Sequence, residues 1–493
     1  MSDSRAAGGD PAFASATELA RRIRAGELGS EELVDHYLAR IEAHDPRIGA
    51  VVTLDADRAR QRAREADRAR ARGELRGPLH GVPITVKDTL ETAGLRTTAG
   101  HPPLAEHVPA ETAPAVARLL AAGAILLGKT NTPALAGDWQ THNAIFGTTR
   151  NPWDPTRTPG GSSGGSAAAL AAGLSALELG SDIGGSIRVP ASWCGVYGHK
   201  PTHGIVPHRG HIPGPPGTLS EPDLSVVGPL ARSAEDLALA LDLLAGPLPD
   251  RAVAWRLELP PPRARDLREL RIAAWIHDPE FEPDPGVALV LEEALDALRR
   301  EGARIDPGAR PVPRVRDALE VYERVLWPVF LAGYPEHTWR ALEAVASRSD
   351  PGDRSPLAVM ARCGTVSHRE WLAAHEARER LRARLRAFFA DFDVLLLPVC
   401  QVPAIPLDPS EPQTARTIRV AGAERPYADL FAWIALATAC HLPATVVPAG
   451  RSPEGLPVGL QVVGPFLEDR TPLAFAAAFA RLRGGFSPPP AFA

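Results

Sequence analysis

A serine follows two glycines in the segment GSDIGGSIRVP, residues 180–190. Glycines allow backbone N–H groups to crowd around a reacting oxygen, so this setting is typical of a nucleophile beside an oxyanion hole. The serine, Ser186, needs a base, because a serine hydroxyl alone is a weak nucleophile. The next histidine along the chain, His199, is followed by Lys200 and Pro201, and nothing marks it as that base. The G-x-S-x-G turn of many serine hydrolases is also absent around Ser186.

Lysine is rare in this chain and is therefore a second place to look for a base. Of 54 basic residues, three are lysine: Lys87, Lys129 and Lys200. Lysine can lose its proton when it is buried, whereas arginine stays charged. A position that needs a neutral amine therefore cannot use arginine. Genomic base composition also explains a bias towards arginine, so the count alone does not choose among the three.

A second loop rich in serine and glycine, TPGGSSGGSAAALAAG, covers residues 158–173. A flexible linker is one interpretation of this composition. The small-residue run that follows instead predicts a tightly packed helix that begins near 163–166, with its N-terminal N–H groups directed at the loop. A phosphate loop is disfavoured, because the Gly-Lys-Ser/Thr ending is missing.

Strands and helices that alternate along the chain must position these loops. Apolar runs predict buried strands, and apolar residues at helical spacing predict helices. The expected strands lie at 80–90 (ending on Lys87), 124–130, 271–278, 393–399, 443–450 and 456–465. The expected helices lie within 15–48 and at 55–72, 112–123, 232–246 and 286–303. This alternation indicates an α/β protein with a largely buried sheet.

Composition sets limits on location and partners. The chain has 493 residues, is 44% hydrophobic and has a net charge of −5, which gives no electrostatic reason to expect nucleic acid or an anionic membrane. No signal peptide or membrane span is predicted, and we expect a soluble, cytoplasmic protein. The spacing of the four cysteines suits neither zinc nor a disulfide framework; they are Cys194, Cys363, Cys400 and Cys440.

The segment from Gly160 to Thr202, GGSSGGSAAALAAGLSALELGSDIGGSIRVPASWCGVYGHKPT, resembles the signature of the amidase signature family. HGVPITVKD upstream and LPVGLQVVGP near the C-terminus are also similar to motifs of that family. The resemblance covers about 15–245 and 385–485. It implies an α/β amidase signature fold, with one large mixed β-sheet covered by helices on both sides. It divides the chain into an N-terminal helical segment (1–75) and one amidase signature domain (76–493), with a variable, mostly helical insertion at about 250–385.

The family uses serine, serine and lysine without histidine, and this answers the question of the base. Carried over by motif, Ser186 is the nucleophile, Ser162 is a bridging serine that follows a cis peptide after Gly161, and Lys87 is the base. Burial disfavours the charged form of lysine and lowers its pKa. A neutral Lys87 then accepts the proton of Ser186 through the hydroxyl of Ser162, which both donates and accepts hydrogen bonds.

The resemblance also implies the surroundings of the nucleophile. The oxyanion hole is expected from the backbone N–H groups of Ile183, Gly184, Gly185 and Ser186. From their positions on either side of this loop, Asp182 and Arg188 are expected to form a supporting ion pair, and Gly161 is expected to support the second loop. Residues close to the two loops are candidate substrate contacts: Trp139, Gln140 and Ser163. A position in the core is the alternative for Trp139.

Other polar residues are given structural roles. We expect Lys129 and Lys200 to be structural and Asp88 to cap a turn. The loop that holds His208 and His211 is expected to be an ordinary surface connection.

The predicted function is an amidohydrolase that cleaves a carboxylic acid amide to an acid and an amine or ammonia through a serine acyl-enzyme. Trp139 favours an apolar acyl group, an aryl amide or a carbamate. Esters and urethanes pass through the same tetrahedral oxyanion, so both stay open as further substrates. No metal and no organic cofactor is expected. The expected partner is a small amide, with no nucleic acid and no membrane, and a homodimer is left open.

Two alternatives remain. One is the A subunit of a glutamyl-tRNA(Gln) amidotransferase, whose branch of the family carries G-R-V-S-R-Y-G after K-P-T. This chain has HGIVPHRGHIPG at 203–214, which counts against that branch. The other is a catalytically inactive binding protein on an amidase fold. Its signature would be the loss of Lys87, Ser162 or Ser186, and all three are present.

Overall fold

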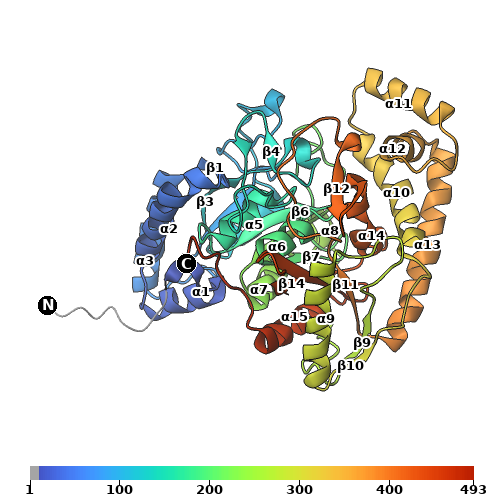
Figure 1. Cartoon of the computed structure of the whole chain (residues 1–493). Coiled ribbons are helices and arrows are strands. Elements are labelled where there is room, and N and C mark those ends of the chain that lie inside the picture. The colour runs from blue at the N-terminus through green and yellow to red at the C-terminus, as the bar shows by residue number, and fades with distance from the viewer. Residues whose placement is uncertain (1–9) are drawn as a thin grey trace.

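The computed structural model describes residues 10–493 and places one large β-sheet at the centre of the chain (Figure 1). The strands of this sheet are β1 (Val51–Leu54), β2 (Pro83–Lys87), β3 (Ile125–Thr130), β6 (Glu178–Asp182), β7 (Tyr197–Lys200), β8 (Val226–Ala231), β9 (Arg271–Ala274), β10 (Arg304–Asp306), β11 (Val394–Pro398), β14 (Ala444–Arg451) and β15 (Pro457–Val463). Two small hairpins lie outside it: β4 (His142–Asn143) with β5 (Gly147–Thr148), and β12 (Thr417–Val420) with β13 (Ala423–Pro426).

The eleven strands lie in the order β1-β3-β2-β6-β8-β7-β14-β15-β11-β9-β10. Strand β2 is parallel to both of its neighbours, β3 and β6, and β9 is parallel to β10 and β11. The strands from β6 to β11 in this order pair antiparallel. The sheet is therefore mixed, and the predicted fold class is confirmed.

The central strands are apolar on both faces. This explains why their sequences are continuous runs of apolar residues instead of alternating apolar and polar residues. In β11, Val394 and Leu396 belong to one hydrophobic cluster, whereas Leu395 and Leu397 belong to another. Successive side chains of a strand point to opposite faces, so a strand buried on both sides needs an apolar residue at every position. A cluster therefore covers each face of the sheet.

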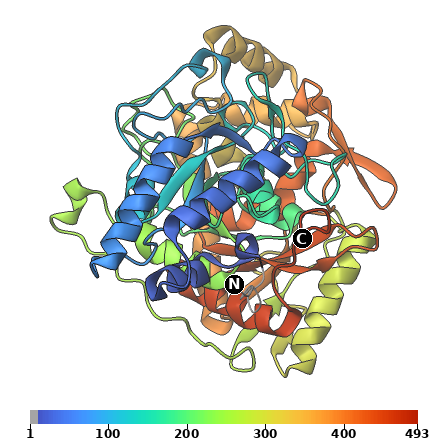
Figure 2. The same cartoon turned by 90° about the vertical axis from the view of Figure 1, so that its left-hand side faces the viewer.

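Helices form a layer over each cluster. One cluster includes residues of α1 (Ala16–Ala25), α2 (Ser30–His44), α3 (Ala56–Ala71), α4 (Pro114–Ala121), α7 (Ala234–Leu244), α9 (Pro285–Arg300) and α15 (Arg470–Arg483). The other includes residues of α5 (Gly164–Ala171), α6 (Arg188–Cys194), α10 (Val315–Leu331), α13 (His368–Asp391) and α14 (Ala432–Ala439). Figure 2 shows the N-terminal helices α2 and α3 (blue) next to each other, where they pack together.

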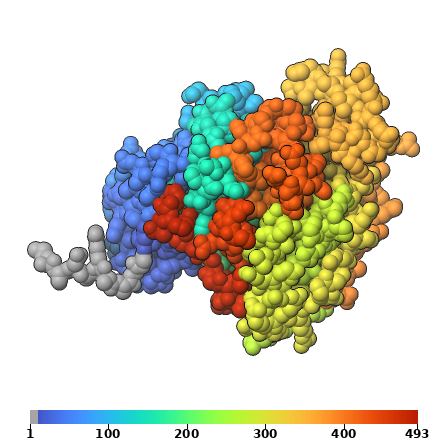
Figure 3. Space-filling view, in the orientation of Figure 1, coloured from blue at the N-terminus to red at the C-terminus, as the bar shows by residue number. Residues whose placement is uncertain are grey.

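The two outer parts of the chain contribute strands as well as helices. Segment 1–75, expected to be helical, also supplies β1, which pairs antiparallel with β3. The insertion at about 250–385 supplies β9 and β10 as well as α8 (Pro249–Ala252), α11 (Glu336–Arg348) and α12 (Pro356–Gly364). Helices α11 and α12 project from the upper right of the molecule (Figure 3). The domain boundaries themselves stay a prediction.

Candidate active site

Lys87 is the last residue of β2, in the parallel part of the sheet. All five residues of this strand, PITVK, are buried. The Nζ atom of Lys87 donates to Oγ of Ser162 at 2.6 Å and to Oγ of Ser181 at 3.0 Å. Ser181 lies in the neighbouring strand β6 and was not found from the sequence. The chain therefore brings Lys87 and Ser162 together as expected, although 75 positions separate them.

Burial lowers the pKa of Lys87 to about 7, against a smaller opposing effect of the Asp182 carboxylate. Burial also lowers the pKa of Lys129 and of Lys200 to about 7, so a neutral amine is common to all three lysines. Their contacts differ. Lys129 donates to the backbone of Leu90 and to Thr92, and Lys200 donates to two backbone carbonyls. Only the contact with a serine of the second glycine-rich loop distinguishes Lys87 from the other two.

The loop that carries Ser162 is tightly enclosed. The peptide between Gly161 and Ser162 is cis, as the resemblance implies. A Cβ atom on Gly161 would lie 2.4 Å from the carbonyl oxygen of Asp138, so no larger residue fits there. The backbone N–H of Ser163 donates to the carbonyl oxygen of Ser186 at 3.1 Å, which joins this loop to the one that carries the nucleophile. Within the described part of the chain, no hydrogen bond joins the hydroxyls of Ser162 and Ser186.

The Ser186 loop connects β6 to α6 and is organised by one carboxylate. Asp182 accepts hydrogen bonds from the backbone N–H groups of Gly185 and Ile187, each at 3.0 Å. It also accepts from the guanidinium of Arg188 at 2.8 Å, in a pair that is fully buried. Burial alone would raise the pKa of Asp182, but Arg188 and the other donors lower it overall. The expected ion pair is present and holds the turn in shape.

The oxyanion loop needs one correction. The N–H of Gly185 is already bonded to Asp182, so it does not point at a substrate oxygen as expected. The hydroxyl of Tyr322 donates to the carbonyl of Ile183 at 2.8 Å, and a trans peptide then directs the N–H of Gly184 the opposite way. Among residues 10–493, the N–H groups of Ile183, Gly184 and Ser186 have no protein acceptor. These three remain the candidate donors.

Aromatic side chains surround the carbonyl side of this loop. Trp139 donates through Nε1 to the carbonyl oxygen of Gly184 at 2.8 Å, and its ring lies 4.4 Å from that of Phe431. The ring of Phe431 also lies 5.6 Å from Tyr322 and 5.9 Å from Trp327. Trp139 thus lies beside the nucleophile loop and is buried in a hydrophobic cluster, and its contact with substrate stays a prediction. The other three rings were missed, because aromatic residues in helical patterns are usually core.

Gln140 and Ser163 do not fit the substrate contacts expected of them. The Oε1 atom of Gln140 accepts from the backbone N–H of Asp408 at 2.8 Å. The hydroxyl of Ser163 contacts both backbone groups of Ser181 at 3.3 Å, and the side chain is fully buried. Both polar groups are used to fix the chain around the site.

Of the remaining polar residues, Asp88 has a structural role and the histidine loop differs from its prediction. The Asp88 carboxylate accepts from the N–H and hydroxyl of Thr98, ten positions further along the chain, and so closes a loop instead of capping a turn. His208 and His211 are buried, so their loop is not a surface connection. The backbone of this loop is hydrogen-bonded to the turn that follows Lys87, and this pairing takes it inside. The cis peptide between Ile212 and Pro213 lies next to it.

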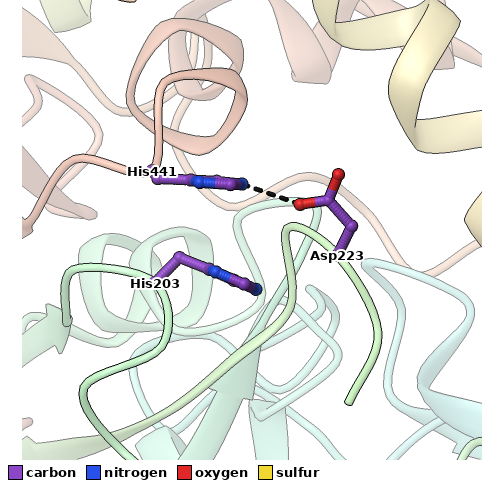
Figure 4. A group of neighbouring side chains, drawn as sticks. All are labelled: His203, Asp223 and His441. Carbon is purple, nitrogen blue, oxygen red and sulfur yellow. Dashed lines mark hydrogen bonds and ion pairs between the residues drawn. The ribbon is translucent and has the colours of Figure 1, made fainter. Parts of the chain in front are cut away.

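The same loop is anchored further along by a cluster of polar side chains. Figure 4 shows the stacked rings of His203 and His441 beside Asp223, with ring centroids 4.3 Å apart. Their nitrogen and oxygen atoms lie within 4.8 Å of one another, the arrangement of a candidate metal site. However, the guanidinium of Arg378 binds the second carboxylate oxygen of Asp223 and lies 3.5 Å from Nε2 of His441. The guanidinium of Arg378 already supplies the positive charge that a metal ion would bring to Asp223. We therefore interpret the cluster as an anchor for residues 203–223.

Comparison with known proteins identifies the family of this site. The family model described as Amidase matches residues 32–473. The A subunit of the glutamyl-tRNA(Gln) amidotransferase of Thermus thermophilus is 38% identical over 489 residues, which cover 94% of this chain and 97% of that protein. The chain belongs to the amidase signature family. The family match includes the stretch between 250 and 385, where no motif had shown a resemblance.

Solved structures agree with the amidase family fold. A chain from a vestigial protein complex, described with the evolutionary origins of an s-triazine catabolic enzyme, has a TM-score of 0.78 and 30% identity, over 96% of this chain and 99% of that one. A bacterial aryl acylamidase of the amidase signature family has a TM-score of 0.77 and 25% identity, over 95% and 96%. No helix among residues 10–493 is long and apolar enough to cross a membrane.

Proposed function

We propose that this amidase-family hydrolase cleaves a carboxylic acid amide through a serine acyl-enzyme, with Ser186 as nucleophile, Ser162 as proton relay and Lys87 as base. The observation that carries the proposal is the 2.6 Å hydrogen bond between the fully buried Lys87 amine and the Ser162 hydroxyl. With a pKa of about 7, about half of the Lys87 side chains are neutral at pH 7. A neutral amine is the form that accepts a proton.

The first half of the reaction forms the acyl-enzyme. The Ser186 oxygen bonds to the amide carbon while its proton passes to Ser162, whose own proton passes to Lys87. The carbonyl oxygen becomes an oxyanion near the free N–H groups of Ile183, Gly184 and Ser186. The intermediate collapses when the C–N bond breaks, and the departing nitrogen takes a proton back through the same relay. The products are an ester on Ser186 and a free amine or ammonia.

The second half releases the acid. Water attacks the ester carbon and gives its proton to the relay, so that a second tetrahedral oxyanion forms. Its collapse breaks the bond to Ser186, whose oxygen recovers a proton from Ser162 and Lys87. The acid leaves and the enzyme returns to its starting state. This chemistry needs protein side chains, water and substrate, with no cofactor in any step.

The aromatic side chains support an apolar acyl group as the substrate class. Trp139 and Phe431 lie on the carbonyl side of Gly184, so an acyl chain beside the oxyanion loop meets aromatic rings. Tyr322 is fully buried and packs against Phe431. Aromatic residues gain free energy from apolar and aromatic contacts. Asp138, which precedes Trp139 in the sequence, is already paired with Arg416 at 2.6 Å. An aryl amide, an apolar acyl amide or a carbamate fits this environment, and a matching ester is a further substrate.

A second candidate is the A subunit of a glutamyl-tRNA(Gln) amidotransferase. The description of the Thermus relative favours it over a stand-alone hydrolase. An enzyme of this kind works on glutamine, whose ammonium and carboxylate groups need charged or hydrogen-bonding partners when water is removed. The aromatic contacts around Gly184 support the stand-alone hydrolase instead, and this is the function we propose.

The test is hydrolysis by the purified chain alone, beside Ser186→Ala. The substrates are a benzoyl 4-nitroanilide, a nitrophenyl carbamate, a nitrophenyl ester, a short aliphatic amide and glutamine. Turnover of the anilide or carbamate that is lost in Ser186→Ala supports the stand-alone hydrolase. Glutaminase activity that appears only with the other amidotransferase subunits and glutamyl-tRNA would establish the second candidate. A fluorophosphonate that fails to label Ser186 would exclude both.

A further inference from the structure

His211 is a buried polar side chain that the proposed mechanism does not yet use. Within residues 10–493, neither of its ring nitrogens has a hydrogen-bond partner. Its neighbour His208, whose ring centroid is 4.5 Å away, donates to or accepts from Ser225 at 2.8 Å. Leaving a buried nitrogen without a partner costs free energy, so such a group calls for a ligand. Of the two histidines of this loop, His208 has a hydrogen-bond partner and His211 has none in the described part of the chain.

The backbone places His211 beside Lys87. Leu90 and His211 form an antiparallel bridge, and Ile212 donates to the carbonyl of Thr89 at 2.8 Å. Leu90 in turn closes a turn on the carbonyl of Lys87 at 3.0 Å. Burial lowers the pKa of His211 well below its usual value, and the charges of His208 and Lys87 lower it further. His211 therefore stays neutral, with one acceptor nitrogen and one N–H.

The two sides of the site differ in chemistry. The aromatic rings gather around Gly184, next to the oxyanion loop. The departing nitrogen must take its proton through Ser162 and Lys87, so the leaving-group side of the substrate lies on the Lys87 side. The bridge between Leu90 and His211 places His211 next to the turn that follows Lys87. A hydrogen bond from the departing N–H to a fixed acceptor would hold the nitrogen with its lone pair facing the relay.

We propose that the acceptor nitrogen of His211 binds the N–H of the scissile amide and so favours amides with an N–H over esters and N-alkylated amides. The proposal rests on the proposed function, because it assumes that Lys87 and Ser162 protonate the leaving group. The cluster of Asp223, His203 and His441 anchors the two ends of the segment that contains His211 (Figure 4). His211 is thus a specificity-determining residue for the leaving group.

The experiment uses two substrates with the same benzoyl group, a 4-nitroanilide and a 4-nitrophenyl ester, because only the anilide carries an N–H. His211→Leu should lower kcat/KM for the anilide by about tenfold and for the ester by less than about twofold, as expected for one lost hydrogen bond. His211→Asn, which keeps an acceptor, should recover most of the anilide activity. His208→Asn is the matched control, and its anilide-to-ester ratio should equal that of the wild type.

A second measurement starts from the wild type, so its first comparison does not depend on the folding of a variant. The wild type should prefer the anilide to its N-methyl derivative, and His211→Asn should keep that preference while His211→Leu loses it. Equal losses on anilide and ester in His211→Leu would show a structural role and overturn the inference. An unchanged ratio in both His211 variants would overturn it as well. A wild type without Ser186-dependent turnover of either substrate would instead overturn the proposed function.

Discussion

The dependence of activity on the protonation of Lys87 can be worked out from the structure. Burial lowers the pKa of this lysine from 10.5 to about 7. At pH 7 about half of the side chains are neutral, against about three in ten thousand for an unperturbed lysine, so burial raises the amount of active base by about a thousandfold. The neutral fraction increases about tenfold between pH 6 and pH 8 and then levels off. Activity is therefore expected to fall in acid and to reach a plateau in mild alkali.

The perturbation that isolates this effect is Lys87→Met, with Lys87→Arg as its partner. Methionine is unbranched like lysine and one atom shorter, and it carries no base, whereas arginine keeps the charge but does not deprotonate. Both variants should lose about 10²- to 10⁴-fold in kcat/KM, the usual contribution of general base catalysis. Far-UV circular dichroism and thermal unfolding show whether each variant is folded. Lys87→Met is the one expected to fold well, because it buries no charge.

The assay is kcat/KM for the benzoyl anilide from pH 5.5 to 9.5, with a rapid-mixing experiment to find any burst of product. In a plot of the logarithm of kcat/KM against pH, we expect a slope that approaches one below pH 7 and a plateau above pH 8. A wild-type profile that is flat from pH 6 to 8, with no burst to indicate slow product release, would refute lysine as the base. So would a folded Lys87→Arg variant with more than about a tenth of wild-type activity.

Three further substitutions test the contacts of the site. Ser162→Ala removes the relay and should lower kcat by about 10²- to 10⁴-fold in steady-state assays; near-normal turnover would show that Lys87 acts directly on Ser186. Trp139→Ala removes a ring beside the oxyanion loop. It should lower kcat/KM for a benzoyl substrate more than for its acetyl analogue. Equal losses of kcat/KM on the two substrates would argue against an aromatic acyl site. Arg188→Met leaves the buried Asp182 carboxylate unpaired and should destabilise the fold by about 3–5 kcal/mol in urea unfolding; a loss below about 1 kcal/mol would contradict a structural role for the pair.

Local sequence was sufficient for most strands and helices of the sheet region. The apolar run at 124–130 became β3 (Ile125–Thr130), and the helix expected at 286–303 became α9 (Pro285–Arg300). These elements are long or strongly patterned, so their burial is visible in the residues themselves. Five strands of the sheet were not predicted: β1, β6, β7, β8 and β10. Strand β1 was missed because its four residues are half-buried or exposed at the edge of the sheet and resemble a loop. The prediction of a mixed sheet came from the family resemblance, and the order of the strands, which depends on long-range pairing, came from the structure.

The sequence by itself determined the residue types of the reacting groups: two glycines mark Ser186 as a candidate nucleophile, and the resemblance to the family motifs assigns Ser162 and Lys87. Only the tertiary structure decided which polar groups lack a hydrogen-bond partner within the protein. It assigned the N–H of Gly185 to Asp182 and left both nitrogens of His211 without a partner.

Contacts between distant parts of the chain also came only from the structure. Tyr322 reaches the carbonyl of Ile183 across 139 positions of sequence, from a helix whose pattern looks like ordinary core. Such contacts form when the whole sheet and its two helical layers assemble. A local pattern records whether a residue is apolar, and the completed fold decides which side chain it faces.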